Sequence, residues 1–535
     1  MKFDYTDEQL QAINTQGNLV ITACPGSGKT TVLVKKIEDE MADLQSYQGV
    51  IGITFTNKAS SELKTKIKKL GLFINSSFIG TIDQFCLSEI IYPFAKNIFG
   101  KGPSKIECAK FSELPNDLLK ELEDEFGEVD DVVIQKSFPN ITKFLYLKGF
   151  VVLSMTSQLA SFIISNSSAC QNYIRSKYKT IYIDEYQDSS GSQHCLFKDV
   201  IRLGLKGVVV GDINQSIYKW RDGDPKHLIE LASRTDFTHL SVQQNHRCHP
   251  SITNYANRLL DANAELQVSD KKRVYHCSFQ GTQVNALDRI ADVIAKIMDL
   301  YTELKYSDMA ILVRNNATLD LCSSHFSLPS IIYKDNPLKS SNQESQKIFD
   351  DLLKFKFFED YTATDIIDKY IKKIYKNEKS KLIEVIKQIR VLSIKELESY
   401  IPKAASLISG LEVTTKDVDL LLTVMNDKDI INSYSNPDSI NIMTIHKSKG
   451  LEFQTVFVMD LYKYIFPKYN FDTWEVDDYE QELNLFYVAV TRAIKHCFLV
   501  TSDNRLNSSL QQKVGTDSEF LALDGTQNLY QNYRK

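Results

Sequence analysis

A glycine-rich loop between a predicted strand and a predicted helix constrains the fold of this chain more than any other stretch. The loop reads ACPGSGKTT from Ala23 to Thr31 and fits the phosphate-binding pattern except at its first position, where alanine replaces glycine. The apolar run Asn18–Thr22 is typical of a buried strand, and Lys29–Glu40 has apolar residues at helical spacing. A strand, a tight turn and a helix therefore follow in the order that a phosphate cradle requires.

The residue types in this loop suit a nucleoside triphosphate and its metal ion. Gly26 and Gly28 lack the Cβ atoms that would block close approach of the backbone to phosphate. Lys29 is expected to reach the β and γ oxygens, and Thr30 to place its hydroxyl on Mg²⁺. A chance match in a turn is the alternative, which the flanking strand and helix disfavour. The predicted nucleotide site comprises Ala23, Cys24, Pro25, Gly26, Ser27, Gly28, Lys29, Thr30 and Thr31.

Length and composition predict several domains and argue against a membrane-spanning protein. A chain of 535 residues is too long for one core. A hydrophobic share of 43% with 24% charged residues is typical of globular proteins, and polar residues interrupt the most apolar stretch, 149–164. The net charge is −5, so any contact with nucleic acid must depend on a local groove.

Cysteine usage and the first residues favour a cytoplasmic protein with no membrane partner. The nine cysteines are scattered without a CxxC pair, which indicates neither a zinc site nor a disulfide framework. The start, MKFDYTDEQL, is polar and acidic where a signal peptide needs a basic and then an apolar run. We therefore expect reduced thiols.

The stretch KTIYIDEYQDSS, from Lys179 to Ser190, predicts a strand that ends in adjacent carboxylates. Asp184 is placed to hold Mg²⁺, and Glu185 to orient and deprotonate the attacking water. An acidic pair at a strand end is often only a turn, but behind a phosphate loop the catalytic interpretation is favoured. Gln215, just after the next predicted strand, is a candidate sensor of the γ-phosphate.

Aromatic and basic residues near these strands are candidates for nucleic-acid contact. Phe55 follows the predicted strand Val50–Thr54 and precedes a helix that Asn57 is predicted to cap, and Tyr218 and Trp220 follow the sensor candidate. Such aromatics can stack on bases, although large aromatics are more often buried. The lysines of the helix are either a solvated face or a contact to nucleic acid: Lys58, Lys64, Lys66, Lys68 and Lys69.

Other stretches predict further elements. Gln9 lies in a predicted capped helix, where its amide either contacts an adenine or is solvated. In the second half, Asp308–Arg314 and Ser439–Thr444 predict strands of another sheet. A predicted helix over Glu482–His496 carries Arg492.

Five stretches in this order, TFTNKAS, IDEYQDS, GDINQSIYKW, IHKSKGLEF and YVAVTRA, resemble the motifs of UvrD/Rep-type DNA helicases of superfamily 1. The resemblance covers nearly all of two motor cores. It implies an α/β fold of two RecA-like P-loop motor domains, with parallel sheets flanked by helices and a mostly helical insertion in each. The expected ranges are 1–86 and 176–240 for the first motor domain, 87–175 for its insertion, 241–335 and 436–510 for the second, 336–435 for its insertion, and 511–535 for a polar tail.

The resemblance also implies roles for residues around ATP and Mg²⁺. Lys29 and Glu185 are expected to be catalytic, Gln9 to read the adenine, and Glu452 to grip the ribose. Gln215 is expected to link hydrolysis to DNA. The second motor domain is expected to supply two arginine fingers, Arg247 and Arg492. The expected DNA contacts are Phe55, Asn57, Thr81, Tyr218, Trp220 and His446.

The function implied is ATP-driven movement along single-stranded DNA in the 3′ to 5′ direction, with separation of duplex at a junction. The chain departs from its relatives at His246, where they usually carry a tyrosine, and at Leu483 and Asn484, which replace charged residues. The tyrosine stacks on adenine in relatives, so nucleotide preference is expected to be looser.

The two insertions are shorter than in full-length housekeeping relatives, which keeps a second function open. The compact UvrD-like component of Gabija anti-phage systems has similarly short insertions. We expect no nuclease domain after the last predicted motor strand, which argues against a fused recombination helicase–nuclease. The alternative is therefore an ATP- and DNA-sensing accessory subunit of a separate nuclease in an antiviral defence complex, with little unwinding of its own. An inactive scaffold is disfavoured because the catalytic motifs are intact.

Overall fold

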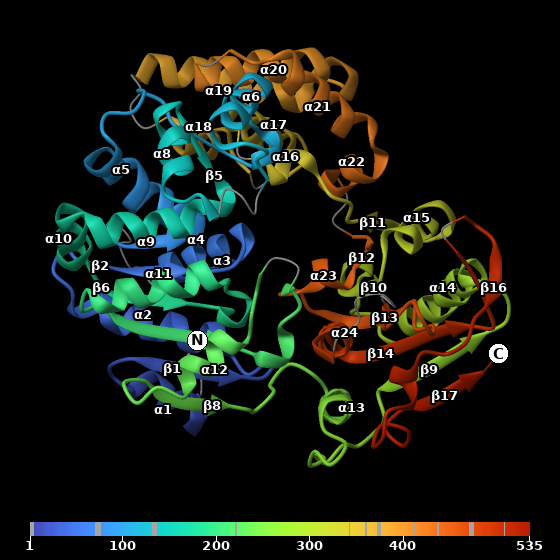
Figure 1. The fold of residues 1–535 in the computed structure, drawn as a ribbon. Helices are drawn as coiled ribbons and strands as arrows, with labels where there is room; N and C mark the ends of the chain where they lie inside the picture. The colour runs from blue at the N-terminus through green and yellow to red at the C-terminus, as the bar shows by residue number, and fades with distance from the viewer. Residues whose placement is uncertain are drawn as a thin grey trace. The chain divides into compact units, whose positions relative to one another are not determined.

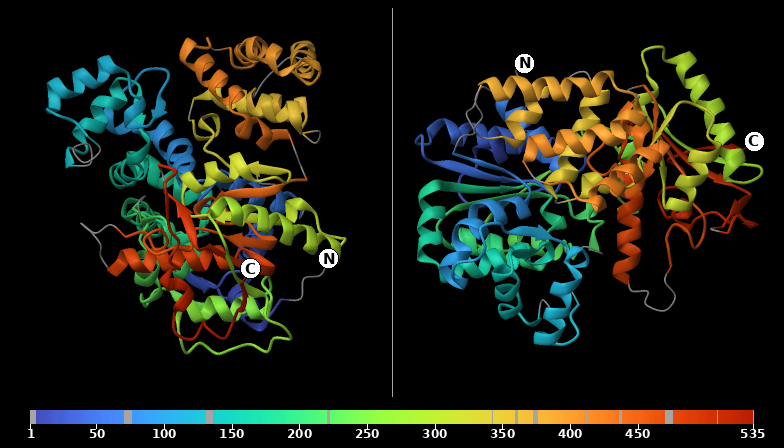
Figure 2. Two further views of the ribbon diagram at one scale, coloured as in Figure 1. Left: turned by 90° about the vertical axis from the view of Figure 1, so that its right-hand side faces the viewer. Right: turned by 90° about the horizontal axis from the view of Figure 1, so that it is seen from above.

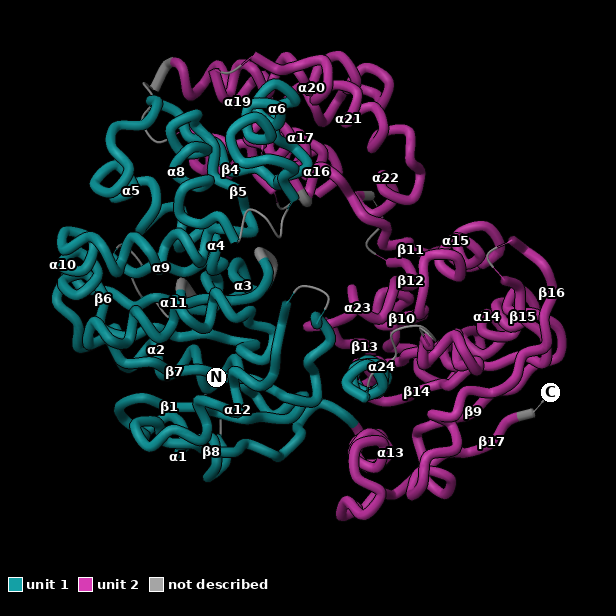
Figure 3. The backbone as a smooth tube through the Cα atoms, viewed as in Figure 1, with its two compact units in different colours: residues 1–248, 476–487 teal, residues 249–475, 488–535 magenta. Residues whose placement is uncertain are grey.

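The computed structural model describes residues 5–69, 76–130, 136–219, 222–341, 343–358, 361–371, 376–410, 412–435, 438–469, 476–507 and 509–534. The chain forms two compact units, which Figure 3 shows in two colours. Unit 1 comprises Met1–Cys248 and Val476–Tyr487, and unit 2 comprises His249–Glu475 and Val488–Lys535.

Unit 1 is built on a six-stranded parallel sheet (Figure 1). Its order is β3-β2-β6-β7-β1-β8, with β1 at Leu19–Ala23, β2 at Gly49–Ile53, β3 at Phe78–Gly80, β6 at Tyr178–Ile183, β7 at Lys206–Gly211 and β8 at Thr238–Val242. The predicted boundary between residues 240 and 241 falls inside β8, so the first sheet extends past it. The segment Val476–Tyr487, expected in the second motor domain, also groups with unit 1.

Helices cover both faces of this sheet because its strands are apolar on both sides. Leu19 and Ile21 of β1 pack in one core with Val32 and Leu33, while Val20 between them packs in the core on the opposite face. The covering helices are α1 (Asp7–Asn14), α2 (Lys29–Asp43), α3 (Asn57–Lys69), α9 (Thr156–Asn166), α10 (Ser168–Lys177), α11 (Gly191–Arg202) and α12 (Lys226–Ala232).

The insertion between β3 and β6 is mostly helical, as predicted, with one pair of short parallel strands. It contains α4 (Ile82–Phe85), the π-helix η1 (Cys86–Ile91), α5 (Tyr92–Phe99), β4 (Glu107–Ala109), α6 (Asn116–Phe126), α8 (Asn140–Leu147) and β5 (Phe150–Val152). Its own core lies between Ala109 and Met155, whereas η1, α9 and α10 contribute side chains to the core of the main sheet. The independent part of this insertion is therefore narrower than the predicted range 87–175.

Unit 2 is built on a seven-stranded parallel sheet of order β11-β12-β10-β13-β14-β9-β17. The strands are β9 (Val274–Phe279), β10 (Met309–Val313), β11 (Ser330–Ile332), β12 (Ile440–Thr444), β13 (Phe453–Val458), β14 (Ala493–Ser502) and β17 (Gln531–Arg534). Its helices include α13 (Pro250–Leu260), α14 (Gln283–Leu300), α15 (Asn316–His325), α23 (Ile445–Ser448) and the end of α24 (Val476–Val490).

The prediction of a simple polar tail over 511–535 is wrong. β15 (Asn504–Leu506) pairs with β16 (Gln512–Val514), and β17 then joins the main sheet beside β9. Phe520 and Leu521 between them are buried. These two apolar residues are the sequence signal for a folded segment, and the polar residues around them obscured it.

The insertion between β11 and β12 is mostly helical, as predicted, and its described residues form no strand. It contains α16 (Pro337–Ser340), α17 (Glu344–Phe357), α18 (Ala363–Tyr370), α19 (Lys376–Val391), α20 (Ile394–Ser409), α21 (Thr415–Asn426) and α22 (Lys428–Ser435), which are the yellow and orange helices grouped together in Figure 2. These helices share one apolar core. No helix in the described part of the chain has the length and apolar character needed to span a membrane.

Candidate active site

The phosphate-binding loop of unit 1 adopts the predicted strand, turn and helix arrangement. β1 ends at Ala23 and α2 begins at Lys29. Gly26 and Gly28 have φ values of 71° and 79°, which favour glycine. A Cβ on Gly26 would lie 2.5 Å from Cβ of Arg247, and a Cβ on Gly28 would lie 2.7 Å from Nε2 of Gln9. Both glycines are therefore required by backbone conformation and by close neighbours.

The predicted metal-binding pair meets at the carboxyl edge of the sheet. The Thr30 hydroxyl, in the first turn of α2, donates a hydrogen bond of 3.1 Å to Oδ2 of Asp184, directly after β6. Asp184 is buried, and its pKa is raised to about 6, first by that burial and then by the charge of Glu185, with Lys29 acting in the opposite direction. A hydroxyl and an ionisable carboxyl are oxygen ligands of the kind Mg²⁺ prefers. The residues present thus fit a magnesium ion.

The ammonium group of Lys29 lies near carboxylates but donates no hydrogen bond to any described residue. Its Nζ is buried and 3.8 Å from Oδ2 of Asp212, and among the described residues it makes no hydrogen bond. That Asp212 oxygen already accepts a hydrogen bond of 2.6 Å from Nε2 of Gln215. A buried ammonium with unused donor capacity fits a phosphate ligand.

Gln187 connects the proposed general base to the neighbouring strand. Its Nε2 donates to Oε2 of Glu185 at 2.5 Å, and its Oε1 accepts from the backbone N–H of Asp212 at 2.9 Å. Glu185 has a positive φ of 55°, which is uncommon for a non-glycine residue and marks a constrained turn. Sequence reasoning missed Gln187 and Asp212, although both lie in quoted motifs and follow the ends of buried strands.

Gln9 is buried and is not the solvated surface residue that the sequence left open. Its Oε1 accepts from the N–H of Thr6 at 3.0 Å, and its Nε2 donates to the carbonyl oxygen of Ser27 at 2.9 Å. These bonds cap α1 and tie it to the phosphate-binding loop. The predicted contact of Gln9 with adenine stays a prediction.

Lys36 of α2 holds the other end of α1. Its buried Nζ donates to the carbonyl oxygens of Ala12, Ile13 and Thr15 at 3.1, 3.1 and 2.7 Å. The last carbonyls of a helix have no partner within the helix, and a cation there also interacts favourably with the helix dipole. Lys36 therefore fixes the helix that carries Gln9.

Replacing Lys36 by methionine is expected to destabilise the protein by roughly 1–3 kcal/mol, because buried carbonyls lose their donor. Lys35→Met is the matched control, since Lys35 is a surface lysine paired with Glu38 and Asp39 and should cost under about 1 kcal/mol. Thermal and urea unfolding of the two variants measures the difference. Equal unfolding midpoints would show that Lys36 does not anchor α1.

Asp184→Asn is expected to raise the melting temperature of the nucleotide-free protein at pH 7. Because the pKa is raised from 3.8 to about 6, the folded chain holds this proton more tightly than the unfolded chain within that window. Stability therefore falls as pH rises through the window, and the full cost of ionisation is present above it. The asparagine variant avoids this cost, so its advantage should shrink as pH falls towards 4.

Melting curves from pH 4 to pH 7 test this prediction. Asp236→Asn is the control, because Asp236 is an exposed carboxylate paired with Arg234, and it should give no gain in melting temperature. A melting temperature for Asp184→Asn at or below that of the parent at pH 7 would contradict the assignment.

Residues 243–248 pack against the phosphate-binding loop within unit 1. The N–H of His246 donates to the carbonyl of Gly26 at 2.9 Å, and Oδ1 of Asn245 accepts from the N–H of Arg247 at 2.8 Å. The thiol of Cys24 donates a hydrogen bond to the carbonyl oxygen of Gln243. Burial raises the pKa of that thiol to about 12, and the charge of Asp212 adds to the effect.

The expectation that Arg247 comes from the second motor domain is therefore corrected, because Arg247 groups with unit 1. Its role as an arginine finger stays a prediction.

Arg492 lies in a turn of unit 2 and not on a helix. α24 ends at Val490 and β14 begins at Ala493, so the predicted helix to His496 is too long. The Arg492 side chain is about 1% exposed, and its guanidinium donates to the carbonyls of Val488 and Leu451 at 3.1 and 3.0 Å. The Arg492 guanidinium thus satisfies the carbonyl oxygen of Val488 near the end of α24. The residues that follow Arg492 pair with β13 and form a strand, which ends the helix earlier than predicted.

Two other predicted residues of unit 2 flank its sheet. Glu452 immediately precedes β13. Because Phe453 of β13 pairs with Ala493 of β14, Glu452 and Arg492 lie next to each other at the start of these two strands. His446 is half-buried in the short helix α23, after β12. Their contacts with ribose and DNA stay predictions.

Phe55 and Tyr218 form a stacked pair in unit 1. Their ring centroids are 5.3 Å apart with an angle of 22° between planes, and both rings are half-exposed. Phe55 follows β2, and Tyr218 lies shortly after the 3₁₀ turn η5 (Ile213–Gln215) that follows β7. Trp220 lies outside the described residues. The aromatic residues are therefore partly available to a base, as stacking requires.

The polar residues expected at DNA serve as helix caps or lie outside the described side chains. The Thr81 hydroxyl accepts from the N–H of Gln84 and caps α4. The predicted cap Asn57 is the first residue of α3, and Thr56 accepts the capping bond from Ala59 instead. The side chain of Asn57, like those of Lys58, Lys68 and Lys69, lies outside the described part of the structure. Lys64 and Lys66 are exposed.

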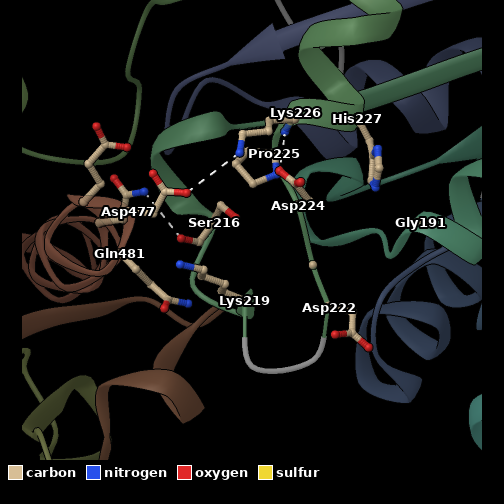
Figure 4. Close-up of a pocket in the computed structure, with 13 residues that line it drawn as sticks. Gly191, Ser216, Lys219, Asp222, Asp224, Pro225, Lys226, His227, Asp477 and Gln481 are labelled. Carbon is tan, nitrogen blue, oxygen red and sulfur yellow. Dashed lines mark hydrogen bonds and ion pairs between the residues drawn. The ribbon is translucent and has the colours of Figure 1, made fainter. Parts of the chain in front are cut away.

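A cavity of about 520 Å³ lies beside the segment that carries Tyr218 (Figure 4). Lys219 pairs with Asp478 at 3.1 Å, and Lys226 approaches Asp477 at 3.8 Å. The sequence left the role of Asn484 unassigned. Its Nδ2 donates a hydrogen bond of 3.4 Å to the carbonyl oxygen of Ser216. All of these residues belong to unit 1.

Two family models and several known proteins match the chain. The UvrD/REP helicase N-terminal domain matches residues 5–138 and 150–237, and the UvrD-like helicase C-terminal domain matches residues 337–504. The chain is 29% identical to Gabija protein GajB of Bacillus cereus, with 92% of this chain and 95% of that protein covered. It is 26% identical to ATP-dependent DNA helicase Rep of Buchnera aphidicola (94% and 94% covered) and 25% identical to ATP-dependent DNA helicase PcrA of Staphylococcus epidermidis (93% and 83% covered).

Proposed function

Because this chain belongs to the UvrD/Rep-type helicases, we propose that it is an ATP-dependent DNA helicase that moves along single-stranded DNA in the 3′ to 5′ direction. The observation that carries the proposal is the arrangement in unit 1, where Thr30 is bonded to Asp184 and the buried ammonium of Lys29 has donor capacity left for phosphate. The similarity to Rep and PcrA over most of the chain supports DNA as the substrate.

The side chains divide the work of hydrolysis among them. Lys29 binds phosphate oxygens, and Thr30 and Asp184 hold Mg²⁺, which would neutralise charge on the phosphates. Glu185, held by Gln187, accepts a proton from the attacking water. Arg247 and Arg492 are proposed to stabilise the charge of the transition state.

Coupling to DNA is proposed to run through the segment after β7. Gln215 is bonded to Asp212, close to Lys29, and Tyr218 follows only a few residues later in a stack with Phe55. A change at the phosphates therefore has a short covalent route to an aromatic pair that can contact bases. Contact with bases through their π-faces implies binding that depends little on sequence.

Tyr218→Ala is expected to raise the single-stranded DNA concentration needed for half-maximal stimulation of ATP hydrolysis. Stacking contributes roughly 1–3 kcal/mol per base, which corresponds to about fivefold or more. Tyr47→Ala is the control, because Tyr47 is an exposed tyrosine of unit 1 outside the proposed DNA contacts. The two variants are compared by titrating oligo(dT) at saturating ATP. Identical half-maximal concentrations would exclude the stacking role.

Strand displacement tests the proposed activity and its direction. The purified chain is given ATP, Mg²⁺ and duplexes that carry a single-stranded tail on either the 3′ or the 5′ side. We expect displacement of the duplex with the 3′ tail. Displacement only from the 5′ tail would overturn the polarity.

The similarity to Gabija protein GajB favours a second candidate, an ATP- and DNA-sensing subunit that acts with a separate nuclease in antiviral defence. Hydrolysis that DNA stimulates, without displacement of either duplex, would support this candidate over a helicase acting alone. Copurification of the full chain from its native host would then identify the partner.

A further inference from the structure

Two helices of unit 1 bring together three side chains that commonly bind metal ions. His194 lies in the first turn of α11, and His227 and Glu230 lie on α12. The spacing of three residues places His227 and Glu230 on one face of their helix. One ligand atom from each side chain lies within 4.8 Å of the other two. We propose that His194, His227 and Glu230 bind a divalent transition-metal ion, with Zn²⁺ as the best match to the donor set.

The distances suit a small tetrahedral ion after a modest adjustment. Nε2 of His194 is 3.0 Å from Oε2 of Glu230. Zinc bonds of about 2.0–2.2 Å place neighbouring tetrahedral donors roughly 3.3 Å apart. The rings of His194 and His227 are stacked with centroids 4.5 Å apart, so His227 must turn its ring to join them. It is only half-buried on a surface helix, which leaves room for that rotation.

Neighbouring groups already orient two of the ligands. The hydroxyl of buried Tyr186 lies 2.8 Å from Nδ1 of His194, so Nδ1 can donate to it and direct Nε2 towards the ion. Burial lowers the pKa of His194 to about 4, with Lys198 and His227 adding to the effect, so the ring is neutral at pH 7. Lys198 contacts Oε1 of Glu230 at 3.3 Å and leaves Oε2 facing His194.

The site is separate from the proposed magnesium site and has its own access. Mg²⁺ prefers oxygen ligands, whereas two imidazoles and a carboxylate suit zinc and its neighbours in the periodic table. His227 lines the cavity shown in Figure 4, which gives an ion a route to the ligands. Tyr186 directly follows Glu185, so a bound ion would brace the turn that carries the proposed base.

The test is a titration of the full chain with Co²⁺, followed by visible absorption, with Zn²⁺ as competitor. We expect one equivalent of tetrahedral Co²⁺, displaced by Zn²⁺. In His227→Ala and Glu230→Gln the affinity should fall by roughly 100-fold or more, since removing a ligand costs at least as much as removing a group that supports one. Both positions are partly exposed, so both variants should fold, which melting curves check.

Two controls separate this ligand set from other histidines and thiols. His325→Ala removes an exposed histidine of unit 2, and Cys195→Ser removes the exposed thiol next to His194. Both should bind Co²⁺ as the parent does. Absence of a tetrahedral spectrum in the parent, an unchanged spectrum in His227→Ala, or its loss in Cys195→Ser would overturn the assignment. In the first case the Tyr186, His194 and Glu230 contacts would be a metal-free hydrogen-bonded chain.

Discussion

Replacing Lys29 by alanine is expected to abolish ATP hydrolysis, with a loss of at least about 10³-fold in kcat/KM. Among the ion pairs of the described residues, the Lys29 ammonium is the one buried cation within 4 Å of the Asp212 carboxylate. Its N–H groups make no hydrogen bond to the described residues and can therefore bind phosphate. Removing a preorganised donor to developing charge typically costs roughly 10²–10³ in rate, and lost binding of the phosphates adds to this. Steady-state phosphate release and nucleotide binding measure the two parts separately.

Lys35→Ala is the matched control for this variant. Lys35 lies on the same helix, but its ammonium pairs with Glu38 and Asp39 on the surface. It should hydrolyse ATP at the parent rate. Parent-like turnover in Lys29→Ala would mean that the phosphate-binding loop is not the site of hydrolysis.

Glu185→Gln is expected to lower kcat by roughly 10²–10⁴-fold while nucleotide binding remains, because the amide cannot accept the proton of the attacking water. The substitution keeps the shape of the side chain, and the new amide oxygen can still accept the hydrogen bond from Gln187. Loss of rate should therefore reflect lost proton transfer and not a collapsed turn. Single-turnover hydrolysis together with binding of a fluorescent nucleotide analogue measures the two effects.

The control for Glu185→Gln is Glu121→Gln, at an exposed carboxylate of the first insertion that pairs with Lys148. This control should match the parent in rate and in melting temperature. A rate in Glu185→Gln within about threefold of the parent would exclude Glu185 as the general base, since general-base catalysis contributes at least about 10²-fold.

The sequence predicted the parts of the fold in which local pattern and burial agree. The strand before the phosphate-binding loop and the strand before Asp184 are apolar because helices cover both faces of a parallel sheet, and both were predicted within one or two residues of β1 and β6. The loop glycines were predicted because their conformation requires glycine.

The remaining features depend on contacts that no local pattern encodes. β17 joins the sheet of unit 2 although its residues are polar, since pairing with β9 satisfies its backbone. The residues Ala493–His496 would extend a helix by their spacing, yet pairing with β13 makes them strand. Gln187 and Asp212 come together only because β6 and β7 are neighbours in the sheet.

The most direct test of the central claim, that hydrolysis in unit 1 is coupled to single-stranded DNA, is the steady-state rate of ATP hydrolysis by the full chain with Mg²⁺ as oligo(dT) is titrated. We predict a rate that rises with oligo(dT) to a plateau in the parent and stays at background in Lys29→Ala. A parent rate that does not change with oligo(dT), or a rise of the same size in Lys29→Ala, would contradict the claim.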